Sequence, residues 1–458
     1  MLGFSNRRRF LAASAAGLGA VSAAAQTSAK PESPARLPAP GGKLALLGGA
    51  PVRKQKFPSW PNFGASDEKA LLDVLHSRLW CRMVAKATSN RFEEAFAKML
   101  GAKHLVAVNS GTMALVASLH VLGVGPGDEV IVPVYTFGAT VNCVFMTYAL
   151  PIFVDVDPET FQIDTRKIEK AITPRTAAII PVHQGGNAAD MDAVLALAKK
   201  HKLRVVEDAC HGHLAEWRGR KLGTLGDAGC FSLQVSKLLT AGEGGLIATM
   251  DDEIGEKCFK FQNNGRGLQR NFTPLWSPTW ETRGANIRMT EFQAALLHSQ
   301  LEGMEERARL RSENADYLTG MLKEIPGILP AKMYPGCTRN SYHIYMARYK
   351  KEHFAGVPRD TFLKALRAEG IPMSTGYTAL NREPFIQEAL ESKAYRKVYP
   401  REVLASYMER NRCPVNDQLL DEQLWLWSSN LLGTRQDMEQ VAEAVRKIQA
   451  NAAELRKA

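Results

Sequence analysis

Three segments of the sequence carry side chains that could bind an anionic group and react with it. Each follows an apolar run: Asn109-Ser110-Gly111-Thr112, Glu207-Asp208, and Phe231-Ser232 through Lys237. A turn between a strand and a helix offers free backbone N–H groups and the positive end of the helix dipole to an anion. A lysine amine that is shielded from water has a lowered pKa and becomes nucleophilic. These residue types therefore predict a site for a phosphate-bearing, amine-reactive cofactor.

Pyridoxal phosphate (PLP) would use all three segments. It needs a phosphate site, to which Gly111 and Thr112 are suited, and an acid such as Asp208 that keeps the ring nitrogen protonated. It also needs a lysine such as Lys237 for the Schiff base, and His211 could bond the phenolic oxygen of the ring. Each feature has an ordinary alternative: a helix cap, a capping or metal-binding acid, a structural histidine, or a surface lysine.

The elements that would position these residues alternate between short apolar runs and helical patterns. We expect strands at 105–108, 129–132, 151–156, 177–182, 203–207, 231–233 and 245–250, with helices at 112–122, 136–148 and 191–202. Apolar strands separated by helices predict an α/β fold whose mostly parallel sheet is covered on both faces. The carboxyl ends of such strands are where ligands bind, which is where the candidate residues lie.

Four regions are predicted along the chain. Residues 1–30 form a leader, 31–62 an irregular arm rich in Pro and Gly, 63–305 a large domain, and 306–458 a smaller C-terminal α+β domain. A long helical pattern at 290–322 bridges the two domains as one helix.

Composition narrows the classes of partner. The chain has 458 residues, 45% of them hydrophobic, and a net charge of +11, but its basic residues are scattered among nearly as many acids. We therefore expect a basic surface rather than a nucleic-acid interface. The seven cysteines show no metal-ligand spacing, which predicts free thiols and no metal site, and no stretch approaches the ~20 apolar residues of a stable membrane span.

The leader resembles a twin-arginine export signal. Arg7-Arg8-Arg9-Phe10-Leu11 precedes a run rich in Ala, Gly and Ser that ends at Ala23-Ala24-Ala25. The resemblance implies export to a periplasmic or other extracytoplasmic compartment. A disordered basic tail on a cytoplasmic protein is the alternative.

Several ordered motifs resemble those of the DegT/StrS sugar and cyclitol aminotransferases. They are Asp208-Ala209-Cys210-His211, Gly226-Asp227, Phe231 through Lys237 to Gly245, and Asn286 through Glu291. The similarity runs from about Leu46 to the C-terminus. It implies the aspartate-aminotransferase-like fold and PLP as the cofactor.

The resemblance also implies a role for each site residue. Lys237 corresponds to the Schiff-base lysine and proton carrier, and Asp208 to the acid at the ring nitrogen. Six further residues surround the cofactor: Gly111, Thr112 and Ser232 at the phosphate, Phe137 stacked on the ring, His211 at the ring oxygen, and Asn286 at the phosphate of the neighbouring subunit's site. A residue shared in this way implies a homodimer with joint active sites.

The activity implied is transfer of an amino group from an amino acid, Gln or Glu, to a keto-sugar or keto-cyclitol. Residues 376–385 and 425–433 look more like the scyllo-inosose branch of the family. Two segments expected near the substrate depart from the family: Gln184-Gly185-Gly186 replaces a Leu-Tyr/Phe-Gly run, and 78–87 lacks the usual tryptophan context. A non-catalytic or regulatory PLP-binding protein, and a PLP-dependent lyase or epimerase, remain alternatives.

Overall fold

The computed structural model describes residues 41–83, 87–267 and 279–457 of the chain. The predicted leader at 1–30 and the first ten residues of the predicted arm lie outside these ranges, as do residues 84–86 of the segment at 78–87. The export signal and the arm's first part therefore stay predictions.

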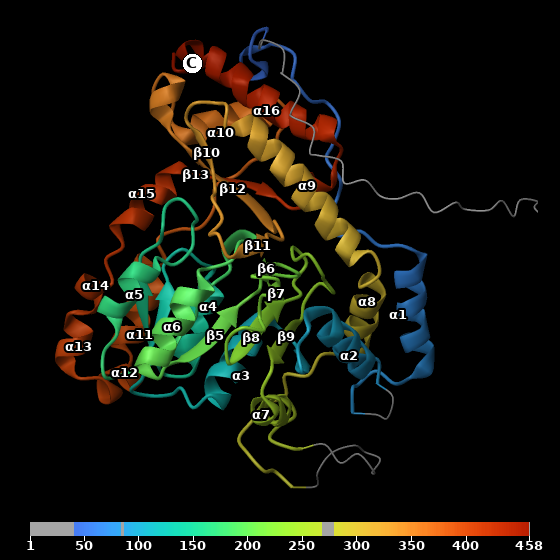
Figure 1. Cartoon of the computed structure of the whole chain (residues 1–458), viewed down its shortest axis with the longest axis vertical. Helices are drawn as coiled ribbons and strands as arrows, with labels where there is room; N and C mark the ends of the chain where they lie inside the picture. The colour runs from blue at the N-terminus through green and yellow to red at the C-terminus, as the bar shows by residue number, and fades with distance from the viewer. Residues whose placement is uncertain (1–40, 84–86, 268–278, 458) are drawn as a thin grey trace, which may run out of the picture. The chain divides into compact units, whose positions relative to one another are not determined.

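A seven-stranded sheet forms the centre of the predicted large domain, with strand order β1-β9-β8-β5-β4-β2-β3. Figure 1 labels β5, β8 and β9 of this sheet. Its strands are β1 (His104–Val108), β2 (Glu129–Pro133), β3 (Leu150–Val154), β4 (Thr176–Ile179), β5 (Arg204–Asp208), β8 (Ala228–Ser232) and β9 (Gly245–Thr249). β9 is antiparallel to both of its neighbours, and the remaining pairings are parallel. The mostly parallel sheet predicted from the alternating pattern is confirmed.

Both faces of this sheet are buried. In β1, Leu105 and Ala107 join one hydrophobic cluster while Val106 and Val108 join another, because successive side chains of a strand point to opposite faces. The helices that pack against the strands are α2 (Thr88–Leu100), α3 (Gly111–Val121), α4 (Gly138–Met146), α5 (Thr165–Ala171), α6 (Met191–His201) and α7 (Asp252–Gln262). Burial on both faces explains why the strands appear in the sequence as nearly continuous apolar runs.

Two helices occupy the region where one long helix is predicted. α8 (Glu291–Gln300), which packs against α1 (Ala65–Ser77), ends shortly before Gly303. Gly303 has a φ of +73°, and α9 (Met304–Leu322) begins directly after it. A right-handed helix cannot continue through a left-handed residue, and glycine adopts that conformation at little cost. The prediction of a single helix over 290–322 is therefore wrong.

The C-terminal part of the chain contains a second, antiparallel sheet. Its strand order is β10 (Ile328–Pro330), β12 (Ile344–Tyr349) and β13 (Gln423–Trp427). Side chains from α9, α10 (Arg359–Ala368) and α16 (Arg435–Ala450) share a hydrophobic core with this sheet. A third small sheet joins β11 (Cys337–Arg339) to β6 (Glu216–Trp217) and β7 (Arg220–Lys221). This arrangement matches the predicted fold class. The last helix of the described chain is the short α17 (Ala452–Leu455).

Five short helices between residues 384 and 422 pack against the edge of the central sheet. They are α11 (Pro384–Glu391), α12 (Lys393–Val398), α13 (Arg401–Ala405), α14 (Tyr407–Arg410) and α15 (Pro414–Glu422). The Tyr395 hydroxyl donates at 2.7 Å to the carbonyl of Ala149, the residue before β3. The Tyr407 hydroxyl donates at 2.6 Å to the carbonyl of Pro151, within β3. The boundary predicted between residues 305 and 306 stays a prediction.

The segment from residue 41 to 58, which contains the short turn η1 (Ala45–Leu47), is tied to the C-terminal core. Leu44 is fully buried in that core. The fully buried carboxylate of Glu369 accepts the backbone N–H groups of Ala45 and Val52 and pairs with the Lys447 ammonium at 2.9 Å. Because a buried charge is costly unless it is paired, this group holds the segment in one place.

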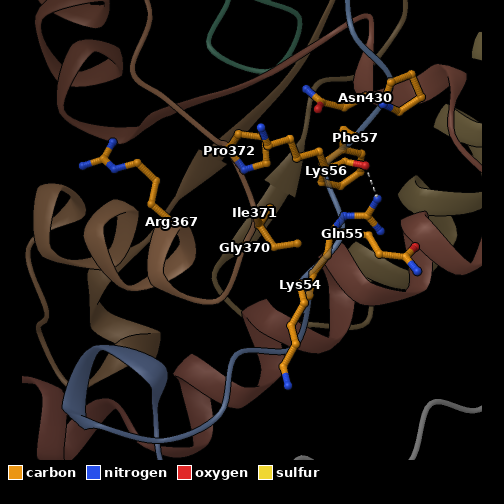
Figure 2. Close-up of a pocket in the computed structure, with 11 residues that line it drawn as sticks. Lys54, Gln55, Lys56, Phe57, Arg367, Gly370, Ile371, Pro372 and Asn430 are labelled. Carbon is orange, nitrogen blue, oxygen red and sulfur yellow. Dashed lines mark hydrogen bonds between the residues drawn. The ribbon is translucent and has the colours of Figure 1, made fainter.

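A surface pocket of about 450 Å³ lies beside this segment, between residues 53–58 and the end of α10. Figure 2 shows that the Lys54 and Arg367 side chains point in different directions from its rim. Arg53, a third basic residue here, is already bonded to Asp437 and Gln440. Lys54, Arg367 and Arg53 therefore do not converge on one ligand position.

Three further observations concern side-chain chemistry and membranes. All seven cysteines are free, as predicted. In the described ranges, no helix is long and apolar enough to cross a membrane. The same residues contain no cluster of three or more His, Cys, Asp or Glu side chains suited to a metal ion, and the absence of a metal stays a prediction.

Candidate active site

A pocket of about 690 Å³ opens at the carboxyl ends of the central strands, beneath residues of the C-terminal sheet. Seven of the predicted site residues line it: Gly111, Thr112, Phe137, Asp208, His211, Ser232 and Lys237. They come from the ends of β1, β2, β5 and β8 and from the segments that follow these strands. The parallel sheet thus brings together residues that are up to 126 positions apart, from Gly111 to Lys237.

The turn before α3 and the end of β8 form a tight cradle. The Ser110 hydroxyl caps the helix by accepting the Met113 N–H at 3.2 Å. A Cβ atom added to Gly111 would lie 2.8 Å from the Cβ of Ser232 and 3.1 Å from the sulfur of Cys210. Only glycine leaves this space open, so the backbone N–H groups at the helix N-terminus and the Ser232 hydroxyl can share one anion.

Asp208 is buried and its carboxylate is held on both oxygens. Oδ1 accepts the Cys210 N–H at 3.2 Å, and Oδ2 accepts the Thr140 hydroxyl at 2.7 Å. Thr140 is itself bonded to the Thr136 hydroxyl at 2.8 Å. The two threonines were missed in the sequence because their apolar surroundings indicate core helix. In the structure Thr140 lies in the first turn of α4, whereas Thr136 precedes the helix.

Lys237 is half-buried in the same pocket, and its backbone N–H donates to the Gln234 carbonyl at 2.8 Å. Burial lowers the pKa of the Lys237 amine, while the neighbouring Cys210 and Asp208 act in the opposite direction. A lowered pKa increases the fraction of neutral amine, which is the nucleophilic and proton-accepting form.

His211 is neutral in this environment. Burial, followed by the charge of Lys237, lowers the pKa of the imidazole well below its usual value. Its Nδ1 accepts the Gly185 N–H at 3.3 Å, so the ring proton is assigned to Nε2. His211 can therefore donate a hydrogen bond to a ligand oxygen in the pocket.

Glu207 supports Asp208 from behind the pocket. Its fully buried carboxylate accepts backbone N–H groups from Gly223, Leu225 and Gly226 and bonds His183 Nε2 at 2.9 Å. Burial acts to raise the pKa of Glu207, but His183 and these N–H groups together lower it. The charged carboxylate thus anchors the carboxyl end of β5, from which Asp208 projects.

An aromatic wall borders the opposite part of the pocket. Tyr377, Trp425 and Trp427 all line it, and the rings of Tyr377 and Trp425 meet edge to face with centroids 4.8 Å apart. Phe137 is 65% exposed, although it would ordinarily be a core residue, because its ring borders the pocket. A flat ligand can therefore stack on the Phe137 ring.

Asn286 is the predicted site residue that does not line this pocket. It is exposed and forms an isolated antiparallel bridge with Asn263. Its predicted contact lies in the site of a neighbouring subunit, so its role stays a prediction.

Comparison with known proteins assigns the chain to a family. The model of the DegT/DnrJ/EryC1/StrS aminotransferase family matches residues 62–446. The chain belongs to the DegT/DnrJ/EryC1/StrS aminotransferase family. It is therefore a PLP-dependent aminotransferase, and the family predicted from the motifs is confirmed.

Curated relatives of this aminotransferase cover most of its length. The L-glutamine:2-deoxy-scyllo-inosose aminotransferase of Streptoalloteichus tenebrarius is 36% identical over 429 residues, which are 90% of this chain and 99% of the relative. The L-glutamine:scyllo-inosose aminotransferase of Streptomyces griseus is 38% identical over 350 residues, 74% of this chain and 82% of the relative.

Solved structures support the same fold. The crystal structure of 3-amino-5-hydroxybenzoic acid synthase matches with a TM-score of 0.76 and 32% identity, covering 87% of this aminotransferase and all of that chain. The crystal structure of S. venezuelae DesV in complex with a ketimine intermediate matches with a TM-score of 0.71 and 32% identity, covering 86% of this chain and 99% of the DesV chain.

The residues of the pocket fit PLP. The open space at Gly111 beside Ser232 suits a phosphate at the start of α3, and the doubly bonded carboxylate of Asp208 suits a protonated ring nitrogen. The exposed Phe137 ring provides a stacking surface, and the neutral His211 a donor for the ring oxygen. Lys237 supplies the amine, so the donor set matches each functional group of the cofactor.

Proposed function

We propose that this aminotransferase moves the amino group of glutamine, or of glutamate, to a keto-cyclitol of the scyllo-inosose type or to a related keto-sugar. The proposal is carried by one observation: Lys237 and Asp208 line the same pocket, which continues to an aromatic wall. The names of relatives that cover nearly the whole chain support both substrates.

Each pocket residue has one task in this scheme. The N–H groups at the start of α3, with Thr112 and Ser232, bind the phosphate, and Phe137 holds the ring by stacking. Thr140 and the Cys210 N–H hold the Asp208 carboxylate in place, and this carboxylate would pair with the ring nitrogen of PLP. PLP, when bound, supplies an aldehyde that condenses with amines and a ring that withdraws electrons from the reacting carbon.

Lys237 moves the proton. Its amine is more often neutral because burial lowers its pKa. Nζ would accept the proton from the α-carbon of the donor and return it to the reacting group in the same pocket. The donor would leave as its keto acid, whose new carbonyl oxygen comes from water, while bound PLP would keep the amino group in the pocket. Lys237 would then assist transfer of this group to the acceptor, whose carbonyl oxygen leaves as water.

A half-reaction with each donor alone tests this proposal. Purified holoenzyme is expected to release one equivalent of keto acid from glutamine or glutamate and then to aminate 2-deoxy-scyllo-inosose or scyllo-inosose. Lys237→Ala should lower both rates by at least about 100-fold, the lower end of a general acid–base contribution. Lys199→Ala, on an exposed face of α6, serves as the control. Full turnover in Lys237→Ala would contradict the scheme.

The active unit in this proposal is a homodimer in which Asn286 reaches the phosphate of the neighbouring site. The exposed position of Asn286 supports this arrangement. Mixing Lys237→Ala with Asn286→Ala subunits should restore about a quarter of the parental activity, because half of the randomly mixed dimers then contain one intact site. No recovery on mixing would place Asn286 outside the partner's site.

Export by the twin-arginine route completes the proposal, and the basic start of the leader supports it. Replacing Arg7, Arg8 and Arg9 together by lysine keeps the charge and should retain the protein in the cytoplasm. An unchanged distribution between cell fractions would contradict the export signal and favour a cytoplasmic enzyme.

A further inference from the structure

Gln184 lines the active-site pocket with an amide that the protein does not satisfy. The residue is 1% exposed, yet neither its side-chain oxygen nor its nitrogen has a hydrogen-bond partner among the residues that the structure describes. The Tyr377 hydroxyl lies near it without the geometry of a hydrogen bond. An amide can accept two hydrogen bonds and donate two, and leaving such a buried group unpaired is unfavourable.

The backbone of Gln184 is fixed by hydrogen bonds that do not involve its side-chain amide. The Gln162 side chain makes two hydrogen bonds to the Gln184 backbone. Its oxygen accepts the Gln184 N–H at 3.0 Å, and its nitrogen donates to the Gln184 carbonyl at 3.1 Å. The next two residues, Gly185 and Gly186, have φ values of +69° and +91°. A Cβ atom on Gly186 would lie 2.2 Å from the Ser341 hydroxyl, so this turn closes tightly against the C-terminal part of the chain.

The strand order places Gln184 away from the phosphate cradle. β5, which ends at Asp208, lies between β8 and β4. Ser232 ends β8 on one side, whereas Gln184 follows β4 on the other, two residues after Val182, which pairs with Asp208. Gln184 is therefore on the side of Asp208 away from the Gly111–Ser232 cradle, and Tyr377 and Trp425 line the same pocket.

We propose that Gln184 determines acceptor specificity by binding two neighbouring hydroxyl groups of a polyhydroxylated ring. Each ring hydroxyl can donate and accept, which matches the paired oxygen and nitrogen of one amide. The aromatic side chains of Tyr377 and Trp425 cover the C–H face of the same ring. This inference rests on the proposed function and names a residue that recognises the acceptor substrate.

Separate half-reactions test the role of Gln184. In Gln184→Leu, release of keto acid from glutamine should change less than about 2-fold, whereas kcat/KM for amination of scyllo-inosose should fall about 10- to 100-fold, chiefly through KM, as expected for loss of hydrogen bonds to a bound substrate. Gln184→Glu, which keeps the accepting atoms, should recover part of this loss. Binding of the unreactive ring scyllo-inositol to Gln184→Leu holoenzyme, measured by calorimetry, should weaken by a similar factor.

Asn416→Leu is the matched control. Asn416 is also fully buried with an unpaired amide, but it lies on α15 outside the pocket. Its acceptor kinetics should match those of the parent enzyme. An equal loss in both half-reactions of Gln184→Leu would overturn the inference in favour of a structural role, and a loss confined to the donor half-reaction would overturn it in favour of a donor site. A parent enzyme that aminates no keto-sugar or keto-cyclitol would overturn the proposed function as well.

Discussion

The hydroxyl of Thr140 donates a 2.7 Å hydrogen bond to Oδ2 of Asp208, in a position where both side chains are buried. The bond comes from the first turn of α4 and reaches the end of β5, so it joins two elements at the pocket. A hydrogen bond to a charged carboxylate stabilises the ionised form. Thr140 therefore helps Asp208 to hold a cationic ring nitrogen.

Thr140→Val should weaken PLP binding about 10- to 100-fold, because a hydrogen bond to a charged group contributes about 1.5–3 kcal/mol. Equilibrium dialysis of the apoenzyme with PLP measures the change. Thr140→Ser keeps the hydroxyl and should bind within a few-fold of the parent. Equal PLP affinity in the valine and serine variants would show that Asp208 does not depend on this bond.

Gly111→Ala should also reduce PLP affinity, by about 10-fold or more, because the added Cβ atom would lie 2.8 Å from Ser232 Cβ and must displace the phosphate cradle. Gly125→Ala is the control, since a Cβ atom there meets nothing within 4 Å. Titration of both apoenzymes with PLP distinguishes them. An unchanged dissociation constant for Gly111→Ala would remove this turn from the phosphate site.

Glu369→Gln should lower the free energy of unfolding by about 3–5 kcal/mol, because it leaves the buried Lys447 ammonium without its charge partner. The matched control is Asp73→Asn, which breaks an exposed i,i+4 pair with Lys69 and should change stability by less than about 1 kcal/mol. Urea unfolding measures both. Equal effects would mean that the segment at 41–58 is not anchored through Glu369.

Acid should destabilise the folded protein through its buried histidines. Burial, with a smaller effect of the Lys237 charge, lowers the pKa of His213 from 6.5 to about 3, so between these values the unfolded chain binds a proton that the folded chain does not. Stability then falls as the pH drops, by up to about 1.4 kcal/mol per pH unit for this residue. The pKa values of His211 and His343 are lowered for the same main reason and act with the same sign.

His213→Leu should therefore make the decline in stability between about pH 6.5 and pH 5 less steep, as followed by urea unfolding. His76→Ala, at an exposed position near the end of α1, should leave the slope unchanged. A steeper decline in His213→Leu than in the parent protein would contradict a neutral, buried His213.

Seven of the candidate site residues line one pocket because they lie at or after the carboxyl ends of strands. Gly111, Asp208 and Lys237 each follow an apolar strand, and strands of a parallel sheet present their carboxyl ends at one edge. The predicted strands were visible for the same reason, since burial on both faces leaves nearly continuous apolar runs. The ordered motifs around these residues are enough to identify the family, because they depend on the order and type of residues and not on distances between them.

Other features depend on contacts that no local pattern encodes. The break between α8 and α9 is an exception, because Gly303 is itself a local signal for the end of a helix. The contact of Glu369 with residues 45 and 52 joins positions more than 300 residues apart. Neither the spacing nor the type of these residues predicts their partners.

The sequence by itself determined the family, through its ordered motifs, and the α/β class, through the alternation of apolar runs with helical patterns. Only the tertiary structure decided which amide faces the pocket unpaired and which hydroxyl supports Asp208. The reason is physical: whether Gln184 or Thr140 has a partner depends on which strands and helices lie side by side, and that is set by packing of the whole chain.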